Sequence, residues 1–171
     1  LEQSTAGNQI IVAKAHKQWN PEFRDVKLVQ AAMLMEQLEM LGNQFAKRPS
    51  QVKCHENFKP PNYTSGQQIP TLVCGDFNST PDSGVYEFLN KGSAPGNHED
   101  FMDHVYGTYT SEGLKHNYAL RSAYSNIGEM PFTNLTPGFQ GKIDYIWYTA
   151  ITLAASCLFG EVDSRFLSRG G

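Results

Sequence analysis

Cysteines are few in this sequence and follow no recognisable pattern. Cys54, Cys74 and Cys157 are widely spaced and odd in number, so we expect neither a zinc site built on a C-x-x-C pair nor a disulfide framework. Reduced, intracellular thiols are the predicted state. The sequence also lacks an apolar run of membrane-spanning length and a basic-then-apolar leader, so nothing in it predicts a membrane protein or a secreted one.

An excess of charge of one sign is also lacking. Lys and Arg number 14 against 17 Asp and Glu, which gives a net charge of -3 and an isoelectric point near 5.9. This balance argues against non-specific duplex binding through a broad basic face, so a nucleic-acid substrate would have to be held locally, through metal. With 171 residues, 40% of them hydrophobic and 12% aromatic, the chain can bury one sizeable core, so we expect one domain or a large piece of one.

The most informative stretch, residues 69–89, predicts a strand, an acidic turn and a helix. Residues 71–74 form a short apolar run that is typical of a buried strand. Asp76 and Asn78 follow at its end. Pro81 and the residues after it provide turn and helix-start chemistry, and the apolar spacing from residue 85 suits a short helix.

An Asp-x-Asn at the carboxyl end of a strand is a candidate ligand site, because ligands of open α/β sheets collect there. The Asp76 carboxylate and the Asn78 carboxamide can hold a hard cation through oxygen and offer an N–H to a phosphoryl oxygen. An Asx turn followed by a helix cap explains the same residues without a ligand. A calcium loop is rejected, because Pro81 stands where an EF-hand needs glycine.

Residues 9–13 predict a second buried strand, closed by a lysine and His16. A single histidine at a strand end is more often structural than catalytic. The segment W-N-P-E-F-R-D that follows combines aromatic, rigid and polar groups, a surface on which a nucleobase can stack. A plain turn with Trp19 packed into the core is an equally good interpretation.

A long covering helix is expected over residues 26–45, with Asp25 as its N-cap, its methionines filling the core and Lys27 on the side opposite the apolar stripe. Residues 46–68 predict a long surface loop, and residues 106–124 allow no firm assignment.

A strand over residues 143–148 carries Asp144 among apolar neighbours, and such a carboxylate needs a partner: a metal, a histidine or a salt bridge. Another buried strand over residues 151–159 and a helical tail over 160–169 complete the prediction.

Polar residues between positions 97 and 104 admit two interpretations. These residues could form a metal cluster: His98, Asp100, Asp103 and His104. A solvated, capped helix start explains them with fewer assumptions.

Three segments together resemble a known family: W-N-P-E-F-R-D-V-K-L-V-Q, C-G-D-F-N-S-T-P-D-S-G-V-Y-E-F-L and F-T-N-L-T-P-G-F-Q-G-K-I-D-Y-I-W-Y. They are similar to the catalytic domain of the carbon catabolite repressor type deadenylases, the nuclease subunits of the Not complex, within the exonuclease, endonuclease and phosphatase superfamily. Fungal members resemble the chain most. The resemblance implies an α/β fold in which two sheets form a sandwich flanked by helices.

The resemblance also implies roles for individual residues. Asp76 and Asn78 match a metal- and phosphate-contacting pair, in which Asp76 helps to orient the attacking water. His16 matches a histidine that contacts the scissile phosphate, and Asp144 matches an aspartate that orients a later catalytic histidine. Pro21 and Phe139 match a pair that sandwiches adenine; these two residues and Asn78 form the expected substrate-binding set.

The implied reaction is magnesium-dependent hydrolysis of the 3′-terminal phosphodiester of poly(A) RNA, releasing AMP, at a two-metal site. The implied partners are poly(A) RNA and the other subunits of the Not complex, in the cytoplasm and also the nucleus. No membrane is expected.

The sequence departs from this family in several places. An upstream half with a metal-binding glutamate and a C-terminal S-D-H strand do not occur within residues 1–171, and lysines stand at positions 14 and 17 where the family has other residues. We therefore expect residues 1–171 to be a single, partial catalytic domain that is inactive alone. The alternatives are a non-catalytic module that binds RNA or a partner, and a related phosphodiesterase acting on a small nucleotide.

Overall fold

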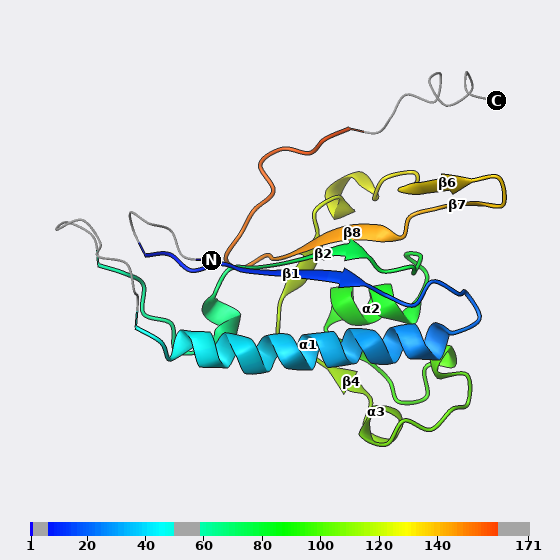
Figure 1. Cartoon of the computed structure of the whole chain (residues 1–171), viewed down its shortest axis with the longest axis horizontal. Coiled ribbons are helices and arrows are strands. Elements are labelled where there is room, and N and C mark those ends of the chain that lie inside the picture. Colours follow the sequence, from blue (N-terminus) through cyan, green and yellow to red (C-terminus); the bar gives the residue numbers. More distant parts are fainter. Residues whose placement is uncertain (2–6, 50–58, 161–171) are drawn as a thin grey trace.

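A four-stranded sheet with two helices on one face forms the centre of the molecule (Figure 1). The computed structural model describes residue 1, residues 7–49 and residues 59–160. The sheet order is β1-β2-β8-β5, with β1 (Ile11–His16) parallel to β2 (Thr71–Asp76) and β8 (Asp144–Thr149) antiparallel to both β2 and β5 (Leu120–Ser122). The predicted mixed α/β class is confirmed.

The remaining elements are short, apart from the first helix. The helices are α1 (Arg24–Ala46), α2 (Gly84–Lys91) and α3 (Thr108–Ser111), with 3-10 turns at Gly66–Gln68, Glu99–Phe101 and Ser125–Ile127. Two further sheets are antiparallel pairs: β3 (Ser93–Ala94) with β4 (Leu114–Lys115), and the hairpin of β6 (Asn134–Thr136) and β7 (Phe139–Gly141). No helix of the described residues is long and apolar enough to cross a membrane.

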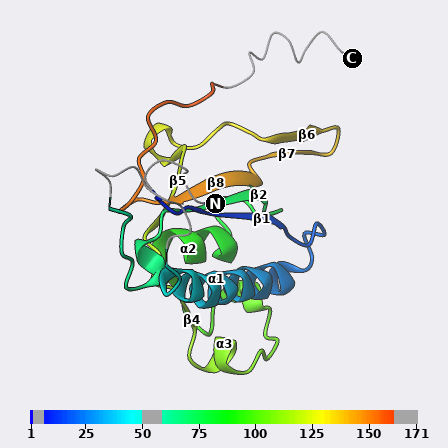
Figure 2. The ribbon, with the colours of Figure 1, turned by 60° about the vertical axis from the view of Figure 1, so that its left-hand side comes forward.

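Helices α1 and α2 cover the same face of the sheet, as two views turned by 60° agree (Figures 1 and 2). The core lies between them and the strands. Its largest fully buried side chains include Trp147, Phe77, Phe88, Leu28 and Met35. Because burying one such side chain is worth about 1.5–3 kcal/mol, this layer supplies most of the hydrophobic stabilisation.

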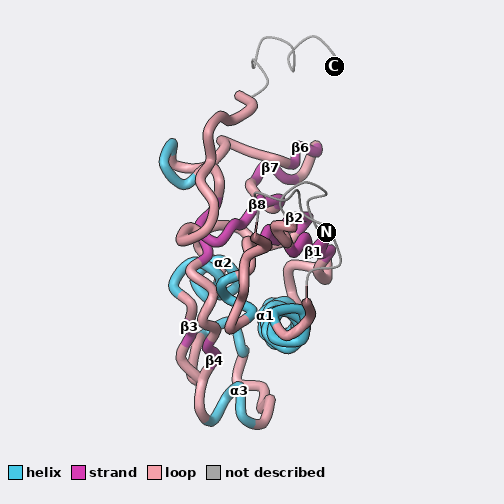
Figure 3. Tube along the Cα trace, turned by 90° about the vertical axis from the view of Figure 1, so that its left-hand side faces the viewer, coloured by secondary structure: helices cyan, strands magenta, loops and turns pink. Residues whose placement is uncertain are grey.

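The opposite face of the sheet is open. Strand β1 alternates between half-buried residues that pack against the core, such as Ala13, and exposed ones, such as Val12 at 50% exposure. Ile146 on β8 is also exposed. Figure 3, turned by 90° from Figure 1, shows α1 and α2 on one side of β1, β2 and β8. The sandwich implied by the resemblance is therefore represented in the described residues by one four-stranded sheet with one covered face.

Several predicted elements are confirmed with shifted ends. The first strand extends to His16, the second to Asp76, and Ser83 caps α2 by accepting a hydrogen bond from the Tyr86 backbone N–H at 3.3 Å. Part of the loop predicted over residues 46–68 lies outside the described residues, and so does the helical tail from residue 161 onward.

Other predictions about α1 are wrong. Its N-cap is Phe23, and Asp25 lies inside the first turn. The Asp25 carboxylate instead accepts a hydrogen bond from the Tyr106 hydroxyl and contacts Nδ1 of His104, both at 2.6 Å. Only Met35 fills the core, whereas Met33 and Met40 are about half exposed.

The strand predicted over residues 151–159 is also wrong. Residues 153–160 have no regular structure, and Ile151 and Phe159 are 68% and 89% exposed. Figure 1 shows this segment leaving the sheet after β8. Both sides of β8 are already occupied, by β2 and by β5. Strand β5 comes from the stretch for which the sequence allowed no assignment.

A close backbone contact fixes β1 against β2 near their carboxyl ends. Gly75 has φ +140°, and a Cβ atom there would lie 1.9 Å from the Ala15 carbonyl oxygen. Gly75 therefore permits an approach that no other residue allows, one position before Asp76.

We expect Gly75→Ala to lower the free energy of unfolding by about 2–4 kcal/mol, because the methyl group would push β1 away and strain the backbone. Urea denaturation measures this change. Gly138→Ala is the matched control: its added Cβ meets nothing within 4 Å, so its effect should stay within about 0.5 kcal/mol. Equal effects of the two substitutions would contradict the proposed close contact.

Candidate active site

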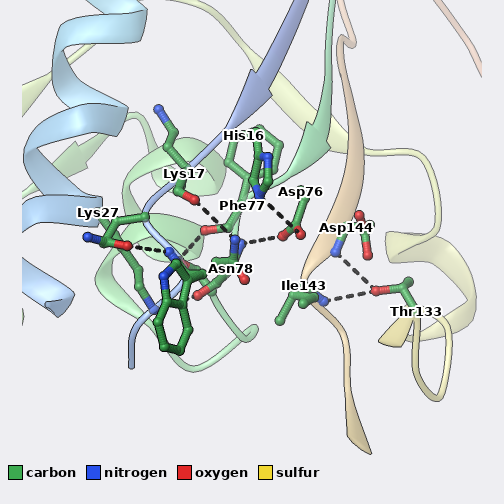
Figure 4. A network of polar contacts seen from close by, with 12 residues as sticks. His16, Lys17, Lys27, Asp76, Phe77, Asn78, Thr133, Ile143 and Asp144 are labelled. Atoms are coloured by element: carbon green, nitrogen blue, oxygen red, sulfur yellow. Dashed lines mark hydrogen bonds and ion pairs between the residues drawn. The ribbon is translucent and has the colours of Figure 1, made fainter. Parts of the chain in front are cut away.

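Strand register brings three of the predicted site residues into one row. His16 is the register partner of Asp76, and Asp76 is the register partner of Asp144. Parallel strands β1 and β2 end where antiparallel β8 begins, so residues distant in sequence meet at one end of the sheet. Figure 4 shows His16, Asp76 and Asn78 together, with Asp144 beside them. The predicted catalytic set is therefore spatially contiguous.

The row lies on the open face of the sheet. The side chain of His16 is 73% exposed and that of Asp76 is 30% exposed, and Nε2 of His16 stands 3.8 Å from Oδ2 of Asp76. This separation is too long for a strong hydrogen bond. It leaves the exposed His16 ring able to reorient toward a ligand.

Asn78 is held in an unusual conformation beside Asp76. Its φ is +47°, a left-handed value that asparagine tolerates better than most residues. Its backbone N–H donates to Oδ1 of Asp76 at 2.8 Å, and its Nδ2 donates to the Lys17 carbonyl oxygen at 3.1 Å. The Asx turn considered as an alternative is thus present. The orientation of the Asn78 carboxamide is fixed as well, because one of its N–H groups donates to the Lys17 carbonyl oxygen.

Two buried lysines lie near this turn, and the ammonium group of one of them, Lys27, supports it. Nζ of Lys27 donates to the Asn78 carbonyl oxygen at 2.8 Å, and Nζ of Lys17 donates to the Gln30 carbonyl oxygen on α1 at 2.7 Å. Burial lowers the pKa of Lys17 to about 8. Burial also lowers the pKa of Lys27, although the charges of Asp100 and Asp76 oppose that shift. Sequence periodicity placed Lys27 on the outer side of α1, so reasoning from sequence missed both roles.

Several neighbouring groups shift the pKa of the Asp144 carboxyl group. Partial burial raises the pKa of its carboxyl group; the Thr133 hydroxyl and His16 lower it, whereas the charge of Asp76 raises it. The Thr133 hydroxyl oxygen also accepts hydrogen bonds from the backbone N–H groups of Ile143 and Asp144, both at 3.0 Å. Two carboxylates in adjacent register positions repel each other, and a cation between them would relieve the repulsion.

The donor set partly fits a magnesium ion. Carboxylate oxygens of Asp76 and the amide oxygen of Asn78 are the oxygen ligands that such an ion prefers, and magnesium usually keeps several waters. Among the described residues, no group of three or more His, Cys, Asp or Glu side chains is arranged to hold a metal ion. Asp76 and Asn78 would therefore supply part of a coordination sphere.

The proposed substrate pair lies beside this row. Pro21, from the loop before α1, and Phe139, on β7, line one cavity of 730 Å³ together with Asn78. This volume falls within the usual range of ligand pockets, about 300–1,000 Å³. Trp19 also lines the cavity and is 71% exposed, so the interpretation that it packs into the core is wrong.

The polar residues near position 100 act as structural connectors. The carboxylate of Asp100 accepts from the backbone N–H of Gly84 at 2.6 Å and from Arg24 at 3.1 Å, and Nδ1 of His98 accepts from the backbone N–H of Asp100. Nδ1 of His104 forms a hydrogen bond with the Asp25 carboxylate. These contacts confirm a capped start, of the 3-10 turn Glu99–Phe101, but the expectation that it is solvated is wrong, because Asp100 is only 4% exposed. The metal-cluster interpretation finds no support in the described residues.

Comparison with known proteins adds a family and several relatives. Residues 50–166 match the model of the endonuclease/exonuclease/phosphatase family. The chain is 55% identical over 170 residues to the CCR4-Not complex 3′-5′-exoribonuclease subunit Ccr4 of Mycosarcoma maydis, covering 99% of this chain and 25% of that protein. The Schizosaccharomyces pombe subunit of the same name is 46% identical, with 98% and 24% covered. The chain thus spans about a quarter of these relatives.

Two solved structures share the fold. The human Nocturnin catalytic domain with bound sulfate anion aligns with a TM-score of 0.53, covering 87% of this chain and 38% of that one. ANGEL2, a 2′,3′-cyclic phosphatase, aligns with a TM-score of 0.58, covering 85% and 46%. Both are 22% identical to this chain. At this identity the likeness establishes the fold alone.

We expect Lys27→Met to lower the free energy of unfolding by about 1–3 kcal/mol, because it leaves the Asn78 carbonyl oxygen without its buried donor. Lys91→Met is the control, since Lys91 contacts Glu87 at 3.1 Å on the surface and its loss should cost less than about 0.5 kcal/mol. Urea denaturation compares the two variants. If Lys27→Met were no more harmful than Lys91→Met, Lys27 would not support the turn.

Proposed function

Because the chain belongs to the endonuclease/exonuclease/phosphatase family, we propose that it forms part of a magnesium-dependent 3′-5′ exoribonuclease that shortens poly(A) and releases AMP. The observation that carries the proposal is the row of His16, Asp76 and Asp144 next to a cavity lined by Pro21 and Phe139. The fungal relatives named as exoribonuclease subunits support the reaction class.

Asp76, Asn78 and His16 each have a separate role in the proposed reaction. Asp76, fixed by the Asn78 backbone N–H, orients the attacking water toward phosphorus. Nδ2 of Asn78 donates one hydrogen to Lys17, so its second hydrogen can serve a phosphoryl oxygen as negative charge develops. His16, exposed at the edge of the row, contacts the same phosphate group. Bound magnesium, held in part by Asp76 and Asn78, would stabilise the attacking and leaving oxygens.

Substrate choice rests on the cavity. A purine ring between Pro21 and Phe139 would stack on two flat surfaces from opposite sides, and such stacking tolerates any base. Preference for adenine is therefore part of the proposal that awaits its own test. We also propose association with other subunits of a Not-type complex, in the cytoplasm and the nucleus, following the names of the relatives.

The test follows a labelled RNA ending in a short 3′ poly(A) tail, with magnesium or with EDTA. We expect stepwise shortening that requires magnesium and falls by roughly 100- to 1,000-fold in Asp76→Ala, since a group preorganised at the reacting phosphate is lost. Glu112→Ala, which removes an exposed acid outside the row, is the matched control. The measurement uses the chain itself and a longer chain that contains it.

The outcomes separate the alternatives. Shortening that persists in EDTA or in Asp76→Ala would contradict the proposed chemistry. If the 171-residue chain binds a poly(A) strand, loses that binding in Phe139→Ala and hydrolyses nothing, it acts as a binding module on its own. Hydrolysis of a small dinucleotide with no shortening of RNA would instead identify a phosphodiesterase of the same family.

A further inference from the structure

Trp19 is a large apolar side chain placed on the surface at the cavity. Its indole is 71% exposed, although tryptophan is usually well buried. It lines the same 730 Å³ cavity as Pro21 and Phe139, two residues before Pro21 in the chain. The chemistry assigned to the row and to the Pro21–Phe139 pair does not use it. An exposed tryptophan at a ligand cavity is typical of a recognition surface.

The backbone that carries Trp19 is fixed even though its side chain is free. The Trp19 backbone N–H donates to Oε1 of Gln18 at 2.8 Å, and the Gln18 backbone N–H donates to Oε1 of Gln30 on α1 at 3.0 Å. One residue further back, the Lys17 backbone N–H donates to the Asp76 carbonyl oxygen at 3.0 Å. The loop is therefore tied both to α1 and to the end of β2. Because the backbone of the loop is fixed in advance, little backbone entropy is lost when the Trp19 ring binds a ligand.

The charge around Trp19 suits a phosphate-linked strand. Arg24 and Lys27 line the same cavity, and the acid among its lining residues, Asp100, is engaged by Arg24 and by the backbone N–H of Gly84. Arg24 is half exposed even though it pairs with Asp100, and Lys27 keeps its charge beneath the Asn78 turn, so the cavity carries more positive than negative charge. A positively charged cavity with an exposed aromatic ring matches the combination of phosphodiester and base in single-stranded nucleic acid. The chain as a whole is acidic, so this local arrangement stands out from its surface.

We propose that Trp19 is a stacking platform for a second nucleobase of the bound strand, next to the base held between Pro21 and Phe139. The proposal rests on the proposed function, because it takes single-stranded RNA as the ligand. Two residues of extended chain span at most about 7 Å, so Trp19 and Pro21 are close enough to serve neighbouring bases. The site then selects for a strand over a mononucleotide.

The chain offers a direct reporter for this subsite. It has two tryptophans, and Trp147 is fully buried, so quenching of the exposed indole by a stacked base reports on Trp19. The full chain is titrated in EDTA, which stops metal-dependent hydrolysis, with AMP, with the dinucleotide ApA and with the two forms of ApA that lack one base. Equilibrium dialysis with labelled ligand measures the dissociation constants independently of fluorescence.

Three variants complete the design. Trp19→Ala removes the ring, Trp19→Phe keeps an aromatic surface, and Phe159→Ala removes a ring that is 89% exposed on the segment after β8. We expect the wild type to bind ApA more tightly than AMP and Trp19→Ala to lose about 5- to 100-fold in affinity for ApA. AMP affinity should not change. Trp19→Phe should retain most of the ApA affinity, and Phe159→Ala all of it.

The ligands that lack one base distinguish stacking on Trp19 from non-specific binding. If Trp19 stacks on one base, removing that base from the ligand and removing the indole from the protein should cost no more together than either costs alone. Additive losses would overturn the proposal. Equal affinity of the wild type for AMP and ApA would also overturn it, while leaving the proposed adenine cavity intact. Binding of neither ligand, both in EDTA and with magnesium added, would instead contradict the proposed function itself, and the second subsite with it.

Discussion

The site depends on the pairing of β2 with a parallel strand on one side and an antiparallel strand on the other. Parallel β1 ends at the same level as β2, and antiparallel β8 starts there, so their terminal side chains share one row. A one-residue slip of β8 would turn Asp144 toward the helices and Tyr145 away from the core. Tyr145 opposes this slip, because its hydroxyl oxygen lies 2.8 Å from the backbone carbonyl oxygens of both Ser79 and Lys142 and its one hydrogen is donated to this pair.

Sequence predicted the local elements of this site better than their packing. The strand, turn and helix around Asp76 were predictable, since a β-branched run, a proline and the Ser83 cap each specify local backbone geometry. The convergence of His16, Asp76 and Asp144 was expected only through resemblance to a family, because register between distant strands is decided by the whole sheet. The structure confirms their proximity; their catalytic roles stay predictions.

Predictions failed where a residue's environment is made by other segments. Asp25 looked like a helix cap but is bound by His104 and Tyr106, which lie about 80 positions later in the chain. The apolar residues 151–159 looked like a strand, yet β5 takes the place beside β8. Lys27 looked solvent-exposed on a helical wheel and is buried under the Asn78 turn. Local propensity cannot anticipate such tertiary contacts.

The strained turn explains why buried lysines lie behind an acidic site. Asn78 at φ +47° exposes its carbonyl oxygen on the side away from solvent, where it needs a donor. A lysine ammonium meets that need at the end of a long stem and adds positive charge near Asp76. The negative charges of Asp100 and Asp76 in turn oppose the lowering of the Lys27 pKa by burial. One side chain thus provides both the hydrogen-bond donor that the turn needs and a positive charge near the acidic site.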